Sequence, residues 1–309
     1  MTRMSRCFLM NSVIGCVALL ATTLAHAQTK PLTVCMAEDN PPLSYQKSQM
    51  SGLDVRISKA IANEVQRPLK IIPFESELEA ESTLAQEASA LLSSGVCDLV
   101  SGYPLLENDL GEPARNLARV PDYPGAKRRN QRPWVKLKAL VPTIAYHTAA
   151  WGIIVREESR VGMTLAAPGD ARFGVVAGTM AGSLLMLYRN GKLRTQLVSL
   201  AQNEQPFKQL EDGKIDATLS SFDHFDAWRL NHPSTTLRRA AYVHPLRINI
   251  GFVLLPNVPD LLKAANTVIK RALADGKLQQ WASQTGVSWT APVNPQVRPP
   301  IGLGDLISD

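Results

Sequence analysis

Gly95-Val96-Cys97-Asp98-Leu99-Val100-Ser101 is the stretch that decides the fold, because a similar one follows later as Gly213-Lys214-Ile215-Asp216-Ala217-Thr218-Leu219. In each copy a helical pattern ends at the glycine, which can adopt the left-handed backbone of a helix end. The aspartate then opens a short apolar strand. The repeat predicts two similar lobes, although this order of elements is also common in α/β proteins without duplication.

Strands and helices alternate on both sides of residue 150. The apolar strand 32–37 ends at paired prolines, and the helical pattern 53–65 leads into the strand 69–74. Further along, the strand 173–177 runs into a glycine turn and a helix. This alternation predicts the fold class α/β, with an open α/β sheet in each lobe.

We expect two strands to cross between the lobes, near 148–152 and 247–251, and to act as a hinge. The tail holds four prolines and should be extended and peripheral. The expected division is a signal peptide 1–27, a first lobe 28–149 plus 251–291, a second lobe 150–250 and a tail 292–309.

The N-terminus has the pattern of a secretory signal. Arg3 and Arg6 precede the apolar stretch 7–24, and Ala25-His26-Ala27 has the small-x-small form of a cleavage site. We expect cleavage after Ala27 and a location in the periplasm. The alternative is a lipoprotein signal that leaves a lipidated Cys16, but the apolar core continues beyond that cysteine, where a polar tether should follow.

Two of the four cysteines, Cys35 and Cys97, lie beyond the signal. One cysteine pair in an exported protein most simply forms one disulfide. Both residues fall in expected strands, 32–37 and 96–101, which a parallel sheet places side by side. Closing the loop between them would stabilise the fold by about 4 kcal/mol in the ideal model.

The net charge is +6, so the chain is only mildly basic. The segment 103–142 lacks clear periodicity, and such a long insertion in a compact domain indicates either a functional loop or local disorder. It gathers a cluster of basic residues without the interleaved aromatics of a nucleic-acid platform. The cluster is either a solvated loop or a docking surface for an acidic partner protein. Its members are Lys127, Arg128, Arg129, Arg132, Lys136 and Lys138.

Open α/β sheets bind ligands beyond the carboxyl ends of their strands, which identifies candidate residues in both lobes. Gly178-Thr179 opens a helix and suits a carboxylate or phosphate, or is an ordinary helix cap. Asp223 suits a cation or a sugar hydroxyl, or caps a turn. The candidate ligand-binding residues are Glu38, Asn40, Tyr45, Ser101, Tyr103, Gly178, Thr179, Ser183, Ser221 and Asp223.

Enzyme signatures are few. The sequence holds no nucleophile elbow, P-loop or paired zinc spacing. His224, between Asp223 and Asp226, is the one acid-base cluster, and a helical surface explains it more simply. We therefore expect no catalytic residue, no cofactor and no metal.

Several of these segments together resemble the family 3 periplasmic solute-binding proteins: Gly52-Leu53-Asp54-Val55, the strand ending at Pro42, Gly178-Thr179, and the stretch from Asp216 to Asp223. The resemblance covers nearly the whole mature chain. It implies the type II periplasmic binding protein fold, closure of two lobes around a small solute, and delivery to an ABC permease. It also implies that Asp223 meets a ligand's amino group and Thr179 its carboxylate.

The chain departs from this family in two places. Amino-acid binders place an arginine after the third strand of the first lobe, where this chain reads Leu105-Leu106-Glu107-Asn108-Asp109-Leu110. Arg115, Arg119 or an arginine of the insertion would have to replace it. The aromatic residue that usually stacks on the ligand aligns with Asn40, with Tyr45 nearby. An ordinary α-amino acid is therefore a doubtful ligand.

The first lobe is also similar to the quinoprotein dehydrogenase-associated binding proteins. The similarity rests on Val34-Cys35-Met36-Ala37, Asn40-Pro41-Pro42-Leu43-Ser44 and the run from Cys97 to Pro104. The subgroup implies a partner role beside an alcohol dehydrogenase that uses pyrroloquinoline quinone. The main hypothesis is a monomeric periplasmic binding protein for a small polar solute. The alternatives are this accessory role and, less favoured, a dehydratase-like enzyme.

Overall fold

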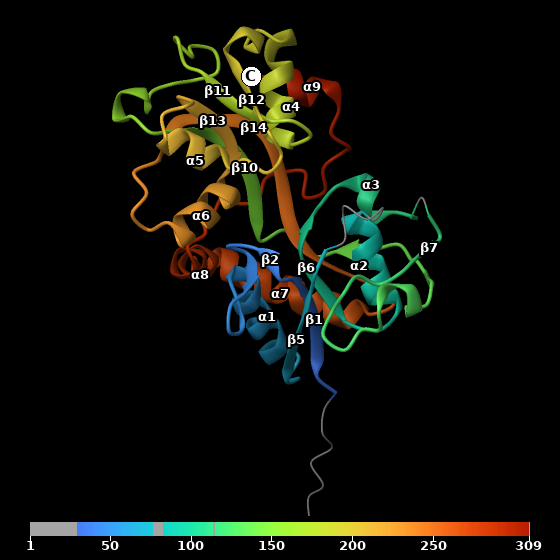
Figure 1. Ribbon diagram of the computed structural model, residues 1–309. Coiled ribbons are helices and arrows are strands. Elements are labelled where there is room, and N and C mark those ends of the chain that lie inside the picture. The colour runs from blue at the N-terminus through green and yellow to red at the C-terminus, as the bar shows by residue number, and fades with distance from the viewer. Residues whose placement is uncertain (1–29, 77–82, 114, 309) are drawn as a thin grey trace, which may run out of the picture.

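The computed structural model describes residues 30–76, 83–113 and 115–308. Within these residues the chain forms two lobes, one above the other in Figure 1, and a single large sheet runs through both. The expected α/β fold of two lobes is thus confirmed. The expected signal peptide, with Cys7 and Cys16, lies outside the described residues.

The first lobe is built on three parallel strands with helices on both faces. Leu32, Val34 and Met36 of the central strand enter one buried cluster, which α1, α7 and α8 cover. Cys35 points the other way, toward α2, as the alternation of a strand requires. The elements are β1 (Leu32–Ala37), β5 (Leu69–Phe74), β6 (Leu99–Pro104), α1 (Leu53–Glu64), α2 (Leu84–Ser93), α7 (Pro259–Ala274) and α8 (Lys277–Thr285).

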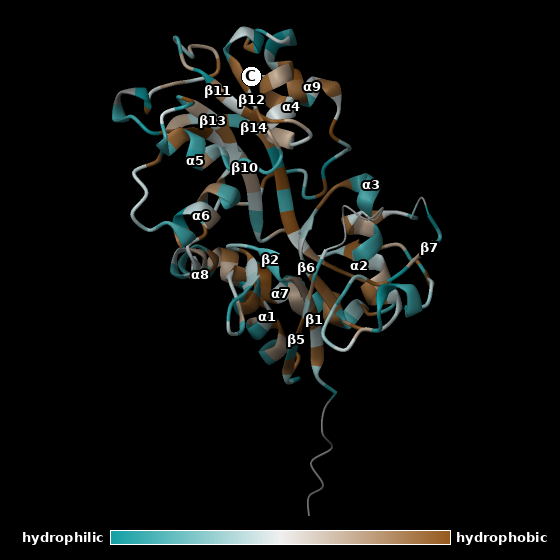
Figure 2. Ribbon diagram, viewed as in Figure 1, coloured by the Kyte–Doolittle hydropathy of each residue, from teal (hydrophilic) through white to brown (hydrophobic). Residues whose placement is uncertain are grey.

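A small three-stranded sheet follows β1 and leads into α1. It consists of β2 (Asp39–Asn40), β3 (Ser44–Gln46) and β4 (Met50–Ser51). Figure 2 shows apolar residues gathered on the strands of the main sheet and on α7, which agrees with the buried clusters.

The second lobe repeats the parallel arrangement, with strand order β12, β11, β13. Its core is a third cluster that includes Phe173, Leu184 and Leu219. The elements are β11 (Phe173–Val176), β12 (Leu197–Leu200), β13 (Ala217–Ser221), α4 (Met180–Leu187), α5 (Pro206–Glu211) and α6 (Phe222–Asn231), with the 3-10 turns η3 (Glu158–Arg160), η4 (Tyr188–Asn190) and η5 (Arg194–Gln196).

Two long antiparallel strands, β10 (His147–Val155) and β14 (Arg238–Leu254), run between the lobes. Near the first lobe, β14 pairs with β6. In the second lobe, β10 pairs with β13. β14 begins well before the strand crossing expected near 247–251, because its first half alternates buried and exposed residues and so has no continuous apolar signal.

The two copies of the repeated stretch occupy equivalent places. Gly95 and Gly213 have φ of 74° and 72°, the left-handed conformation expected at a helix end. Asp98 accepts a hydrogen bond from the backbone N–H of Thr33 at the start of β1 (3.0 Å). Asp216 accepts one from the N–H of Arg172, just before β11 (2.9 Å). Each aspartate therefore fixes the start of the neighbouring parallel strand.

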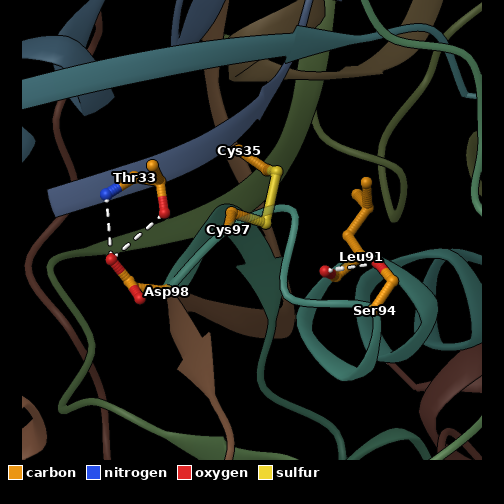
Figure 3. The surroundings of a disulfide bond; sticks show 6 residues. All are labelled: Thr33, Cys35, Leu91, Ser94, Cys97 and Asp98. Carbon is orange, nitrogen blue, oxygen red and sulfur yellow. Dashed lines mark hydrogen bonds between the residues drawn. A yellow bond between two sulfur atoms is a disulfide. The ribbon is translucent and has the colours of Figure 1, made fainter. Parts of the chain in front are cut away.

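Cys35 and Cys97 form a disulfide, with Cα atoms 5.7 Å apart. Figure 3 shows it beside the hydrogen bonds that join Thr33 to Asp98. Cys97 lies just before β6 rather than inside the strand, because the strand begins only after the turn that contains Asp98. The bridge therefore joins β1 to the turn that enters β6.

The insertion 103–142 is irregular but ordered by its own side chains. Arg132 is buried and donates from Nε to the carbonyl of Lys127 and from Nη1 to that of Val120, both at 2.8 Å. Trp134 remains exposed, with Arg119 over its ring at 4.8 Å. The short elements are α3 (Glu107–Leu110), β7 (Leu117–Ala118), η2 (Arg129–Gln131), β8 (Val135–Lys136) and β9 (Val141–Pro142).

The tail crosses the hinge and ends on the second lobe. Asn249 of β14 donates from Nδ2 to the carbonyl of Val293 (2.7 Å). The last helix, α9 (Leu303–Ile307), packs against α4, and Ile301 and Leu306 join the core of the second lobe. The end of the tail thus differs from the extended chain expected from its prolines, because its apolar residues find a partner surface.

Candidate functional site

A cleft of about 990 Å³ lies between the lobes, at the carboxyl ends of parallel strands from both lobes. Ala149 and Ile250 of the hinge strands line its base. This is the position where open α/β sheets bind ligands. The lining includes Asp39, Asn40, Phe74, Ser101 and Gly102 from the first lobe, and Trp151, Gln205, Ser221, Asp223, His224, Trp228 and His232 from the second.

Asn40 and Ser101 are the expected residues of the first lobe that reach the cleft. Asn40 follows β1 in the short strand β2, and Ser101 lies in β6, the neighbour of β1 in the sheet. The turn after β1 and the end of β6 therefore meet at one edge of the sheet. Gly102 has φ of 67°, and a side chain there would meet the amide of Asn40.

Glu38, Tyr45 and Tyr103 do not line the cleft. Tyr103 is buried in the core of the first lobe, where its hydroxyl donates to the carbonyl of Asp109 (2.7 Å) and burial raises its pKa. The left-handed Gly102 interrupts the strand alternation, so Ser101 faces the cleft while Tyr103 turns into the core. Tyr45 lies in β3, with the amine of Lys47 5.5 Å from its ring centre.

Ser221 and Asp223 of the second lobe line the cleft. Ser221 caps α6, since its hydroxyl accepts from the N–H of His224 (3.2 Å). Asp223 lies in the first turn of that helix, where a carboxylate is favoured by the helix dipole. The junction of β13 and α6 therefore presents one hydroxyl and one carboxylate to the space between the lobes.

Thr179 lines a smaller adjoining cavity of about 400 Å³ instead. Its hydroxyl accepts from the N–H of Gly182 (3.0 Å) and donates to the carbonyl of Val176 (2.8 Å). The hydroxyl of Ser183 donates to the carbonyl of Thr179 (3.1 Å). Gly178 has φ of 81° and supplies the turn. The hydroxyls of Thr179 and Ser183 thus cap and brace the start of α4.

Asp223 is held by a hinge residue that the sequence analysis did not single out. Nε2 of His147 lies 3.0 Å from Oδ1 of Asp223. Nδ1 of the same ring accepts the N–H of Thr290 (3.3 Å), so the ring proton is on Nε2 and is donated to the aspartate. The pair links the strand β10, the helix α6 and the segment that follows α8. The histidines are scattered along the sequence, so no local pattern predicts that His147 contacts Asp223.

Asp54 is a second unexpected group, fully buried below the cleft. The hydroxyl of Tyr146 donates to its Oδ1 (2.6 Å). Burial raises the pKa of Asp54 to about 6, against the lowering effect of the Tyr146 and Ser101 hydroxyls. The sequence places Asp54 only in the first turn of a helix, where an acidic residue is ordinary. Its burial comes from the tertiary packing of α1 against the hinge.

Aromatic rings of the second lobe also line the cleft. Trp228 and His232 stack, with ring centres 3.6 Å apart and planes at 16°. Phe207 packs against Trp228 at 5.5 Å, and the indole N–H donates to the hydroxyl of Thr235 (3.4 Å). These contacts hold the indole ring of Trp228 in place where it lines the cleft. Trp151 of β10 adds a further ring.

No arginine of the described chain replaces the missing clamp in this cleft. Arg115 is exposed in the insertion, and Arg119 donates to the carbonyl of Arg129 (3.1 Å). Nor do residues 30–76, 83–113 and 115–308 contain a group of three or more His, Cys, Asp or Glu placed to hold a metal ion. In the same residues, every helix is too short or too polar to cross a bilayer.

The chain has the two-lobed fold of the substrate-binding domains of amino-acid ABC transporters. The second substrate-binding domain of Lactococcus lactis GlnP, in an open conformation, matches with a TM-score of 0.60 at 13% identity, over 84% of this chain and 97% of that chain. The unliganded, open L-cystine receptor of Neisseria gonorrhoeae matches with a TM-score of 0.57 at 14% identity, over 84% and 95%.

An ancestral cationic amino acid solute-binding protein also matches, with a TM-score of 0.57 at 16% identity, over 82% of this chain and 94% of that chain. At such identities the likeness concerns the fold. No protein-family model matches the sequence, and neither does any curated protein.

Proposed function

We propose that this protein is an exported solute-binding protein that captures a small polar solute between its lobes by hinge closure. The observation that carries the proposal is the cleft, which both lobes line and whose base is formed by the two strands that join them. A solute that contacts both walls binds the closed form better than the open form. It therefore shifts an existing equilibrium toward closure.

The two hinge strands can bend while they stay paired with each other. β10 and β14 stay paired through both lobes, and their register shifts between Ala150 and Ile154. Such irregularities interrupt the ladder and locally bend the strands. Thr148 and Asn249, one on each strand, are joined by a hydrogen bond of 2.7 Å. We propose that closure rotates the lobes about this region.

The proposed contacts are those that face the cleft. Asn40 and Ser101 act from the first lobe, and Ser221 and Asp223 from the second. We further propose export with cleavage after Ala27 to the periplasm, where the Cys35–Cys97 disulfide is stable. The proposed division into a first lobe 28–149 plus 251–291, a second lobe 150–250 and a tail 292–309 follows the two strand crossings.

Thermal shift and small-angle X-ray scattering of the mature chain test the proposal. The probes are the twenty amino acids, agmatine, cadaverine, choline, glycerol and ethanol. A binding probe should raise the melting temperature and reduce the radius of gyration, since closure makes the particle more compact. Binding shown by calorimetry with an unchanged radius of gyration would contradict hinge closure.

A second candidate function is that of a partner to a periplasmic quinoprotein dehydrogenase. It is favoured by the exposed Trp134, a single aromatic residue between Arg132 and Lys136 of the basic cluster that the expectation of a cluster without interleaved aromatics overlooked, and one that lies outside the cleft lining. Exposed aromatic residues beside positive charge are typical of protein interfaces. Co-purification from extract distinguishes the two: a dehydrogenase complex lost in Trp134→Ala, without solute-induced closure, supports the accessory role.

A further inference from the structure

The charges that line the cleft all come from carboxylates and histidines. Asp39 supplies one carboxylate from the first lobe, and Asp223 supplies another from the second. Within the described part of the chain, no lysine or arginine lines this space. Burial lowers the pKa of His224, which favours its neutral form. The cleft therefore attracts positive charge and repels anions.

Two arginines of β14 in the second lobe are engaged elsewhere. Arg239 contacts Asp226 (3.4 Å) and Ser288, and it lies over the ring of Phe222. Arg247 donates to the carbonyls of His244 and Leu246. A ligand carboxylate in the cleft would consequently lose its hydration without gaining a cationic partner, which is costly.

The start of α4 does not supply the missing positive charge to this space. The hydroxyl of Thr179 is used as the cap of α4, and the residue lines the adjoining smaller cavity, which shares Trp151, Ser221 and His224 with the cleft. The start of α6 faces the cleft, but Asp223 in its first turn already offsets the helix dipole. Neither helix end places a full positive charge beside the cleft, as an arginine would.

Aromatic rings also line the cleft, next to Asp223 on the wall of the second lobe. Trp228, His232 and Trp151 line the cleft on the side of the second lobe. The indole ring of tryptophan attracts organic cations through its π electrons, and it also packs against the methylene groups of a ligand. Two carboxylates on opposite walls, with rings beside one of them, suit an organic cation that carries methylene groups.

We propose that the cleft selects organic amines without a carboxylate, held between Asp39 and Asp223 and against the rings of the second lobe. This inference rests on the proposed function, because it names the ligand class of the same cleft. An ammonium group at each end of a short chain bridges the two walls and stabilises the closed form. The corresponding amino acid binds more weakly, because its carboxylate enters a negative cleft.

Matched probe pairs test the inference. Cadaverine is lysine without its carboxylate, and agmatine is arginine without its carboxylate. Isothermal titration of the mature chain with each member should give at least tenfold tighter binding for the two amines, which corresponds to about 1.4 kcal/mol. Equal or tighter binding of either amino acid would overturn the inference, as would the absence of binding by all four.

Substitutions of cleft residues show which side chains bind the amine. Asp39→Asn and Asp223→Asn should each weaken binding of the amine roughly tenfold, and Trp228→Leu roughly fivefold. Asp170→Asn is the matched control, because this side chain is 91% exposed and lies outside the cleft lining, and it should change nothing. Asp39 is exposed, so its replacement should leave folding intact even if another variant unfolds. Unchanged affinity in Asp39→Asn and Asp223→Asn would overturn the inference.

The outcomes also separate the inference from the proposed function. Lobe closure in scattering with a neutral solute such as glycerol, without binding of the amines, overturns the inference and leaves the proposed function supported. Amine binding without closure supports the inference about the ligand class and contradicts the hinge mechanism.

Discussion

The two copies of the repeated stretch perform the same task with different means. Asp98 and Asp216 each accept a backbone N–H at the start of a neighbouring strand, and each also accepts from an arginine side chain, Arg67 (2.7 Å) or Arg172 (2.9 Å). Only the first copy adds a disulfide. The repeat therefore fixes the amino ends of the parallel strands in each lobe, whereas the proposed ligand-binding cleft lies at their carboxyl ends.

The lobes also differ at the cleft. The first contributes a turn after β1 and the end of β6, whereas the second contributes the start of α6 with its rings. α1 carries the buried Asp54 in its first turn, while the first turn of α4 has no acidic residue. The first lobe is thus the one with a covalent bridge and with a buried aspartate in the first turn of α1, and perturbing each feature tests this asymmetry.

Removal of the disulfide should have the largest effect. The bridge spans a sequence separation of 62 residues, for which loop-closure entropy gives about 4 kcal/mol. The double variant Cys35→Ala/Cys97→Ala should lose about this much free energy of unfolding in urea at pH 7. Reduction of the wild type with dithiothreitol is the control and should give a similar loss. A loss below 1 kcal/mol would mean that the first lobe does not depend on its bridge.

The next effect should come from Asp54. Its pKa rises from an ordinary 3.8 to about 6, so the folded state binds its proton more tightly than the unfolded state. Stability from this group is full below pH 3.8 and is lost as the pH rises through 6. The loss is about 3 kcal/mol.

The variant Asp54→Asn removes this titration but keeps an oxygen that can accept from Tyr146. The difference in unfolding free energy between wild type and variant should therefore fall by about 3 kcal/mol between pH 3 and pH 7. Asp170→Asn, an exposed carboxyl of the second lobe, should show no comparable trend. A difference that stays constant with pH would show that the folded protein does not perturb Asp54.

The sequence predicts the scaffold better than the site. Apolar alternation, helix ends and the duplicated glycine and aspartate identify the strands and the two lobes, because these features are local. The disulfide between the two cysteines could also be predicted, because it requires only that the strands beside it are parallel neighbours. β14 was recognised only in its second half, since its first half carries no continuous apolar run.

The site depends on contacts between distant segments. Ser221 and Asp223 were found because they follow a strand, but His147, Asp54 and Trp228 were not. His147 reaches Asp223 only through the crossing of β10 and α6, and Asp54 is buried only when α1 packs near Tyr146. Tyr103 follows Ser101 by two residues, yet the backbone of Gly102 sends the two side chains to different places.

The two repeated aspartates should contribute similarly. Asp98→Asn and Asp216→Asn each weaken hydrogen bonds to an arginine and a strand N–H, so each should cost about 1–2 kcal/mol at pH 7. The hydrogen bond from Arg172 lowers the pKa of Asp216, so its contribution is present above pH 3.8 and is lost as the pH falls below that value. Urea unfolding checks both variants, and a cost confined to one lobe would contradict equivalent roles.

The smallest effects should come from the repeated glycines. Gly95 and Gly213 have φ of 74° and 72°, so alanine at either position should cost about 1 kcal/mol in unfolding free energy. A side chain at Gly95 would meet open space, whereas one at Gly213 would lie 3.1 Å from the guanidinium of Arg156, which can move aside. Gly162→Ala is the control, because its φ lies outside the left-handed region and its side chain would also meet open space, and it should not destabilise the protein. Equal costs at Gly95 and Gly213 would assign the penalty to the backbone alone, while a cost at Gly213 above 2 kcal/mol would show that Arg156 is held in place.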